Sequence, residues 1–229
     1  MQDCLRFSDH LHSFNLEIKL IYGPLFEINH LPLSKSPAAN KKLIFTSKNA
    51  IESLLNSKIV FRGQAFCVGS GTAKKARECG IDSISADGNV LDLLQIIKNS
   101  TNPESCDLLY YRGEEISWDL GLELRKLNYS VDEIICYEKV PKYYDLALKN
   151  AIADGIITGA VFFSKNTASL FSKNVASLPN GFYCFCMSRS ISNIIEQFYH
   201  SDQITIKTAR HPTTKSMVNL IIAAYGNKK

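Results

Sequence analysis

Apolar and polar positions along the chain follow two alternating periods. Short apolar runs predict strands, and longer segments with apolar residues three or four apart predict helices. The predicted strands span 17–22, 43–46, 65–68, 82–86, 107–112, 132–139, 159–163, 182–187 and 203–207. The predicted helices lie near 5–14, 48–56, 72–79, 90–99, 115–127, 143–153, 166–174, 190–199 and 213–224. Strands separated by single helices are typical of parallel sheets covered on both faces, so the pattern predicts an α/β fold whose ligands sit at the carboxyl ends of strands.

The pattern also repeats. The run Ile44–Ala50 (IFTSKNA) returns 117 residues later as Val161–Thr167 (VFFSKNT). The run Val68–Thr72 (VGSGT) aligns with Cys186–Ser190 (CMSRS) at an offset of 118. Each copy is an apolar run, then small polar residues, then a helical pattern, as where a strand leads into a helix. The repeat predicts two equivalent units.

A weaker third match pairs residues 14–21 with residues 127–134. In both copies a helix is expected to end at an asparagine, Asn15 or Asn128, which tolerates a left-handed conformation. The second copy follows the predicted strand Leu108–Gly113, whose counterpart in the first copy would fall before Met1. We therefore expect the chain to start one strand late.

Two segments around prolines are expected to cross between the units. They are residues 22–27 and 136–141, and each joins a predicted strand to the next unit. If the chain begins in one unit, completes the other and returns, the two crossings run side by side at a hinge. The sequence leaves open which helices and strands belong to which unit.

Composition limits the classes of function. With 229 residues, 45% of them hydrophobic and 21% charged, the chain is expected to be globular and soluble, and no apolar run approaches the ~18 residues of a membrane span. The N-terminus has no signal-peptide pattern, which predicts a cytoplasmic protein. The net charge of +4 is spread without a basic block, so nucleic-acid binding is not expected.

Cysteine and histidine usage argues against a metal centre. The seven cysteines form no CxxC pair, and the odd number favours reduced thiols, most of them core residues. His10 and His12 are two apart and would point to different helix faces, while the other three histidines stand alone. We expect no bound metal.

Several short segments, taken in order, resemble the uroporphyrinogen-III synthase family. The resemblance covers nearly the whole chain and implies two flavodoxin-like domains with parallel sheets joined by a two-stranded linker. One domain would combine residues 1–24 and 142–229, and the other would span 27–138. The segments that carry the resemblance are Phe45-Thr46-Ser47, Asn49-Ala50, Val68–Ala73, Gly88-Asn89, Arg112-Gly113, Glu133–Tyr137, Phe162–Ser164 and Pro212-Thr213.

The resemblance implies an enzyme that cyclises hydroxymethylbilane to uroporphyrinogen III. Water is lost, the last pyrrole ring is inverted through a spirocyclic intermediate, and no cofactor is needed. The implied partner is this linear tetrapyrrole, handled by a monomer that contacts the preceding pathway enzyme only transiently. Tyr137 occupies the place of the family's tyrosine that assists loss of the hydroxyl, although a packed aromatic residue at a strand end is the structural alternative.

The substrate carries eight carboxylates, but the chain has no arginine cluster to meet them. We expect free amides at helix N-termini after Ser47, Gly71, Gly88 and Ser164 to bind carboxylates, with hydroxyls and two symmetrically placed lysines assisting. Simple helix capping is an alternative for each of these residues and is compatible with binding. The expected binding residues are Thr46, Ser47, Lys48, Ser70, Gly71, Thr72, Gly88, Asn89, Ser164, Lys165, Asn166, Ser188 and Ser190.

Departures from the family pattern and two rival functions complete the expectations. The strand with a Thr-Arg-Pro-like ending before the first helix is absent, Met187 stands in place of a glycine, and Ser190 in place of a threonine.

A non-catalytic two-lobed module that binds a small anion would show the same fold and repeat. A dehydrogenase is disfavoured because Lys74 replaces the third glycine of the dinucleotide-binding pattern.

Overall fold

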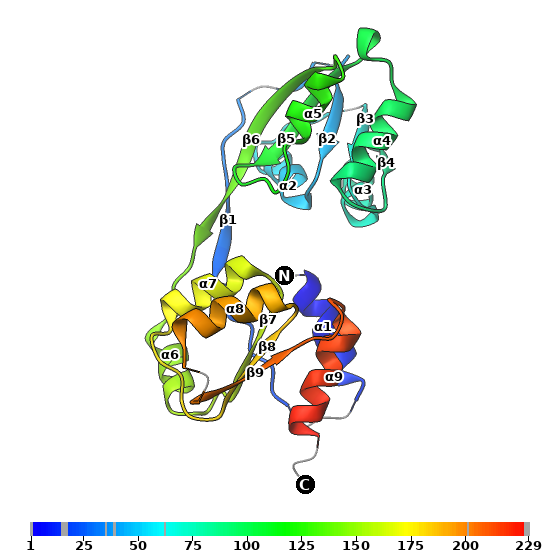
Figure 1. The fold of residues 1–229 in the computed structure, drawn as a ribbon. Helices are drawn as coiled ribbons and strands as arrows, with labels where there is room; N and C mark the ends of the chain where they lie inside the picture. The colour runs from blue at the N-terminus through cyan, green and yellow to red at the C-terminus, as the bar shows by residue number, and fades with distance from the viewer. Residues whose placement is uncertain are drawn as a thin grey trace. The chain divides into compact units, whose positions relative to one another are not determined.

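The computed structural model describes residues 2–14, 18–34, 36–38, 40–61, 63–200 and 202–226. The chain divides into two compact units, which are considered separately below. The first comprises residues 1–26 and 141–229, and the second comprises residues 27–140. Both are built from strands that alternate with helices, as the hydrophobic pattern predicted (Figure 1).

The second unit is built on a six-stranded sheet in the described part of the chain, in the order β1-β6-β5-β2-β3-β4. The five strands from β6 to β4 are parallel. The strands are β1 (Phe26–His30), β2 (Lys42–Phe45), β3 (Gln64–Cys67), β4 (Asp82–Ser85), β5 (Asp107–Gly113) and β6 (Ser130–Pro141). The helices are α2 (Lys48–Asn56), α3 (Ser70–Glu78), α4 (Val90–Ser100) and α5 (Leu120–Lys126), with a 3-10 turn at Pro103–Ser105.

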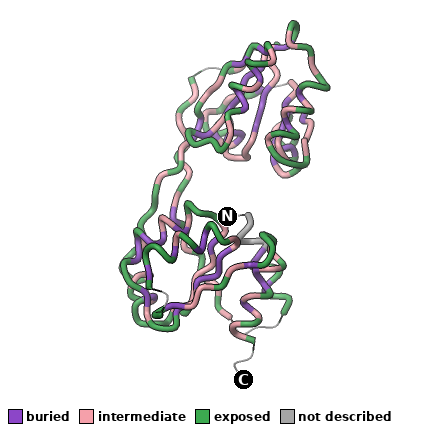
Figure 2. Tube along the Cα trace, in the orientation of Figure 1, coloured by how far each residue is buried: buried purple, intermediate pink, exposed green. Residues whose placement is uncertain are grey.

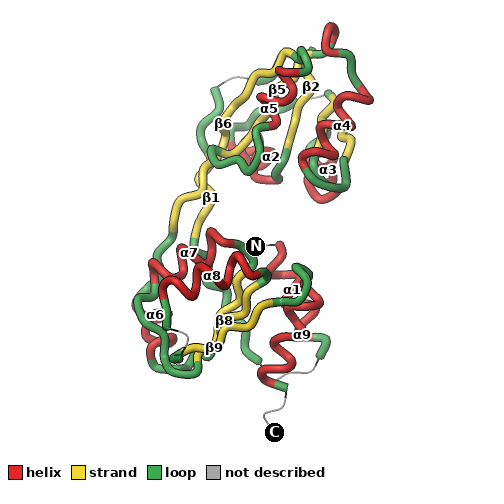
Figure 3. The backbone as a smooth tube through the Cα atoms, viewed as in Figure 1, coloured by secondary structure: helices red, strands yellow, loops and turns green. Residues whose placement is uncertain are grey.

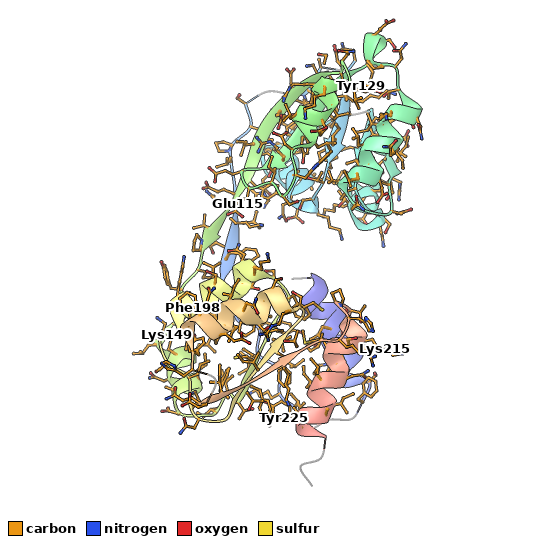
Figure 4. The ribbon with its side chains drawn as sticks, viewed as in Figure 1. Glu115, Tyr129, Lys149, Phe198, Lys215 and Tyr225 are labelled. Atoms are coloured by element: carbon orange, nitrogen blue, oxygen red, sulfur yellow. The ribbon has the colours of Figure 1, made fainter. Side chains whose placement is uncertain are left out.

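The two faces of this sheet form separate cores, because successive strand residues point to opposite sides. Phe45 and Tyr111 pair across β2 and β5 and lie in the core beneath α2 and α3. Ile44 and Tyr110 pair one position earlier and lie in the core beneath α4 and α5. Figure 2 colours buried residues purple and shows such stretches inside this unit. At the amino end of β6, the hydroxyl of Tyr129 (labelled in Figure 4) donates to the Thr101 carbonyl at 3.2 Å.

Strand β1 runs antiparallel to β6. The Leu31 amide donates to the Cys136 carbonyl at 3.0 Å, and the Lys142 amide donates to the Leu25 carbonyl at 2.8 Å. The Asn29 side chain also donates to Glu138 at 2.7 Å. The sequence pattern did not predict a strand over residues 26–30, because its amphipathic stretch is only five residues long and its hydrogen bonds depend on β6, more than 100 residues away.

The first unit contains a parallel sheet with the order β7-β8-β9 among the described residues. Phe162, Phe182 and Cys184 face a core shared with α6, α7 and α8. Phe185 faces the opposite core, which it shares with α1 and α9. The strands are β7 (Gly159–Phe162), β8 (Phe182–Cys186) and β9 (Ile204–Thr208), and the helices are α1 (Gln2–His12), α6 (Leu146–Ala153), α7 (Lys165–Asn174), α8 (Arg189–Phe198) and α9 (Thr214–Tyr225).

Three sequence predictions need correction, and Figure 3 shows the observed elements. The strand expected over 17–22 is not formed in its described part: residues 18–22 are irregular, although Ile18 and Leu20 still pack against the core. Alternating side chains fit a strand, but a strand also needs a hydrogen-bonded neighbour. Helices α5 and α6 begin at residues 120 and 146, later than expected, because Asp119 and Asp145 cap them.

The turn after α5 agrees with the sequence. Asn128 adopts a left-handed conformation with φ of 65°. Asparagine accepts this conformation more readily than most residues, and it ends the helix without a glycine. Asn15, the corresponding residue of the first copy, lies outside the described residues. No helix in the described ranges is both long enough and apolar enough to cross a membrane.

Candidate active site

The repeated serines begin equivalent helices in the two units. Ser47 precedes α2, and its hydroxyl accepts a hydrogen bond from the Asn49 amide at 3.2 Å. Ser164 precedes α7, and its hydroxyl accepts from the Thr167 amide at 3.2 Å. The sequence expectation of helix starts at both serines is confirmed. Each cap leaves the amide next in sequence, Lys48 or Lys165, without a partner among the described residues, so these amides remain available to an anion.

The second repeated turn begins α3 and α8. Neither helix has a side-chain cap bond: α3 follows Gly69, and α8 follows Ser188. The Ser188 hydroxyl instead lies 3.1 Å from the Ser190 hydroxyl. Helix α3 starts two residues earlier than expected, so the Thr72 amide donates to the Gly69 carbonyl, and the first-turn amides that stay free among the described residues lie at Ser70 and Gly71.

The start of α4 differs from the others and corrects one expectation. The Asn89 side chain accepts from the amides of Leu91 and Asp92, at 2.7 and 3.4 Å. The Asp92 carboxylate in turn accepts from the Asn89 amide at 2.7 Å. We expected the amides after Gly88 to be free for a substrate carboxylate, but those of Asn89, Leu91 and Asp92 are occupied by this capping box, whose own carboxylate would repel another anion.

Lys48 extends from the first turn of α2 toward the start of α3. A Cβ atom placed on Gly71 would lie 3.1 Å from Lys48 Cε and 3.2 Å from Nζ. The ammonium group therefore lies next to the free amides of α3, although positive charge at a helix N-terminus is electrostatically unfavourable. Lysine and amides together would favour a bound carboxylate at this point.

Tyr137 lies on β6 with only 8% of its surface exposed. Its backbone carbonyl accepts from the Glu114 amide at 3.0 Å. Its phenol ring covers Gly113 at the end of β5, because a Cβ atom placed there would lie 2.7 Å from Cζ and 2.9 Å from the hydroxyl oxygen. The Ser47 side chain lies close enough to the hydroxyl to favour its ionised form.

Burial raises the pKa of Tyr137, while the Ser47 side chain and the Gly113 backbone act in the opposite direction. The phenol is therefore protonated at neutral pH. A buried, protonated phenol can donate its proton to a leaving oxygen.

A second hydroxyl pair adjoins Tyr137. The Thr46 hydroxyl lies 3.0 Å from the Tyr110 hydroxyl, and burial raises the pKa of Tyr110. Tyr110 also interacts electrostatically with Tyr137. Sequence reasoning missed Tyr110 because its closeness to Thr46 depends on the parallel pairing of β2 and β5, in which Tyr110 pairs with Ile44. We call Thr46, Ser47, Tyr110 and Tyr137 the hydroxyl cluster.

The structure groups the expected site residues by unit. The hydroxyl cluster and the starts of α3 and α4 belong to the unit of residues 27–140. Five expected binding residues belong to the other unit, at the starts of α7 and α8: Ser164, Lys165, Asn166, Ser188 and Ser190. No three His, Cys, Asp or Glu side chains in the described ranges are grouped so that they would hold a metal ion.

Comparison with known families decides which enzymes the chain is related to. The model of the family described as uroporphyrinogen-III synthase HemD matches residues 21–219. The chain belongs to the uroporphyrinogen-III synthase family. The family match extends over both units and includes every residue of the hydroxyl cluster. It supports cyclisation of hydroxymethylbilane in tetrapyrrole biosynthesis, the reaction of a lyase.

One solved structure shows the same fold, and a second aligns with the chain over its full length. Uroporphyrinogen-III synthetase from Helicobacter pylori 26695 is 21% identical, covers 87% of this chain and 91% of its own, and has a TM-score of 0.64. A mutant uroporphyrinogen III synthase from the extremely thermophilic bacterium Thermus thermophilus is 13% identical over 100% of this chain and 97% of its own, with a TM-score of 0.47. The comparison with curated proteins yields no match.

Proposed function

We propose that this chain converts hydroxymethylbilane to uroporphyrinogen III, and that Tyr137 supplies the proton for loss of water. The observation that carries the activity is the family match over residues 21–219. The role of Tyr137 rests on its burial, its raised pKa and the Ser47 side chain near its hydroxyl. The hydroxymethyl carbon loses its hydroxyl group, which takes the phenol proton and leaves as water, and ring closure then returns a proton.

Ser47 fits a supporting role in this step. Its oxygen already accepts from the Asn49 amide, so its own proton is available for the phenol oxygen of Tyr137. When Ser47 donates in this way, the phenol proton stays free for the substrate. The same bond stabilises the phenolate that remains after donation.

The substrate carboxylates are proposed to bind at helix N-termini. In the second unit the sites are the starts of α2 and α3, with Lys48 beside them and with Thr46, Ser70, Gly71 and Thr72 nearby. In the first unit they are the starts of α7 and α8, with the residues Ser164, Lys165, Asn166, Ser188 and Ser190. Gly88 and Asn89 are left out of this proposal because the Gly88 amide donates to the Val68 carbonyl and the Asn89 amide donates to the Asp92 carboxylate.

The proposal extends to architecture and setting. We propose that the two units are flavodoxin-like domains, one built from residues 1–24 and 142–229 and the other from 27–138, with strands β1 and β6 as the linker. The enzyme would act as a cytoplasmic monomer that receives its substrate from the preceding pathway enzyme. The reaction loses water without a change of oxidation state, so the proposal includes no redox cofactor.

An isomer assay tests the activity. Hydroxymethylbilane closes spontaneously to the type I isomer, whereas the proposed enzyme yields type III. The purified protein is expected to shift the product to type III in proportion to its concentration. Only type I product at all protein concentrations would contradict the proposal and would favour the alternative, a two-lobed module that binds an anion without turnover.

A further inference from the structure

The end of β5 meets β6 through a shift in register. Arg112 pairs with Ile135, but Gly113 pairs with Tyr137, so Cys136 is the extra residue of a bulge. Bulges of this kind re-aim side chains next to active sites. Here the shift places the Tyr137 ring against the backbone of Gly113.

Gly113 leaves room for the Tyr137 ring, and its backbone conformation does not itself require a glycine. Its φ is outside the positive range, so an alanine could adopt its backbone angles. A Cβ atom at this position would, however, lie 2.7 Å from both Cε2 and Cζ of Tyr137. These separations are shorter than any normal carbon–carbon contact, so either the ring or the strand would have to move.

The backbone around Gly113 is held in place on several sides. The Arg112 guanidinium donates to the Gly113 carbonyl at 3.0 Å and to the Glu114 carbonyl at 3.2 Å. The same guanidinium pairs with the half-buried Glu133 at 2.5 Å. The Cys136 thiol donates to the Arg112 carbonyl at 3.4 Å. Because the strand is fixed, an added methyl group at Gly113 would displace the Tyr137 ring.

We propose that Gly113 is a positioning residue. Because it has no side chain, the Tyr137 ring can pack directly against its backbone, and this packing sets the position of the hydroxyl near Ser47. The proposal rests on the proposed function of Tyr137 for its effect on turnover. Its structural part, that Gly113 sets where the ring lies, stands independently of catalysis. The two parts therefore need separate measurements.

The test uses Gly113→Ala in the full-length protein. The added methyl group would move the Tyr137 hydroxyl away from the position where it donates its proton. The value of kcat is therefore expected to fall by about 100-fold, with little change in KM. In the Tyr137→Phe background, where no phenol remains to be positioned, the same substitution is expected to lower kcat by far less. Equal effects in both backgrounds would overturn the positioning role.

A spectroscopic readout follows the ring without activity. With ¹³C-labelled tyrosine, the pKa of Tyr137 is expected to move down toward its ordinary value of 10.0 in Gly113→Ala, since the displaced ring gains solvent. An unchanged pKa would show that Gly113 does not set the position of the ring. If Tyr137→Phe keeps wild-type turnover, the catalytic role fails, while this titration still decides the structural claim.

Gly63→Ala is the matched control. A Cβ atom there would lie 2.6 Å from Phe61 Cζ, so it creates a comparable collision in the same unit. It is expected to lower stability while leaving kcat and the Tyr137 pKa unchanged. If Gly113→Ala does not fold, Gly113→Ala combined with Tyr137→Leu, which removes the ring, is expected to restore folding. Failure of that double variant would place the collision elsewhere and overturn the proposal.

Discussion

The hydroxyls of Thr46 and Tyr110 lie 3.0 Å apart, although the two residues are 64 positions apart in sequence. They come together because β2 and β5 are parallel neighbours whose carboxyl ends meet at one edge of the sheet. Tyr110 is 2% exposed, so its hydroxyl depends on Thr46 in place of water. Within the hydroxyl cluster, Tyr110 also interacts electrostatically with Tyr137.

Tyr110→Phe is expected to lower the free energy of unfolding by about 1 kcal/mol, because it removes this hydrogen bond. Thr46→Val is expected to have a similar cost, and the double variant should cost less than the sum of the two. Urea denaturation measures all three. Tyr143→Phe is the control, since Tyr143 is 72% exposed. Strict additivity of the two substitutions would show that the hydroxyls do not interact.

Tyr111 presents the opposite case. Its hydroxyl is buried without a hydrogen-bond partner in the described part of the chain, and burial raises its pKa to about 12. Tyr111→Phe removes a desolvated polar group from the core, so the free energy of unfolding is expected to rise by about 1 kcal/mol. A loss of similar size would mean that the hydroxyl has a favourable partner.

The same substitution is expected to change stability in alkali. In the wild type, unfolding lets Tyr111 lose its proton near pH 10, whereas the folded state holds the proton until about pH 12. The unfolded state therefore binds fewer protons in this window, and stability falls as pH rises through it. Urea denaturation from pH 8 to 11 is expected to show a smaller fall for Tyr111→Phe. Parallel curves would contradict the raised pKa.

Lys48 is expected to contribute to substrate affinity, because its ammonium lies beside the free amides of α3. Lys48→Gln should raise KM by about fivefold at low salt, equivalent to ~1 kcal/mol, with little effect on kcat. The difference should shrink at high salt, since ions screen the charge. Lys48→Arg should retain most of the affinity, and Lys74→Gln, at an exposed position on α3, serves as a control. A salt-independent change in KM would point to lost packing.

Local signals in the sequence were sufficient for some features of the fold and site. The starts of α2 and α7 follow from Ser47 and Ser164, because a capping serine acts within three residues of its own position. The left-handed Asn128 follows for the same reason. The capping box of Asn89 and Asp92 also acts within three residues, and helix capping is the alternative that the sequence allows at this position.

Other features depend on partners far along the chain. Strand β1 exists through its bonds to β6, and no periodicity in five residues reveals it. The contact of Tyr137 with Gly113 depends on a register shift between two strands, which a hydrophobic pattern does not encode. The pairing of Tyr110 with Thr46 likewise required the strand order.

The central claim is that the Tyr137 hydroxyl supplies the proton for loss of water, and the Tyr137→Phe variant tests it most directly. This substitution removes the hydroxyl and leaves the buried ring to pack against Gly113, so the fold should be preserved. The measurement is single-turnover formation of uroporphyrinogen III from hydroxymethylbilane, with Tyr143→Phe as the matched control. The account predicts a fall of about 100-fold or more in the rate for Tyr137→Phe and none for the control. A folded Tyr137→Phe variant that turns over at the wild-type rate would contradict it.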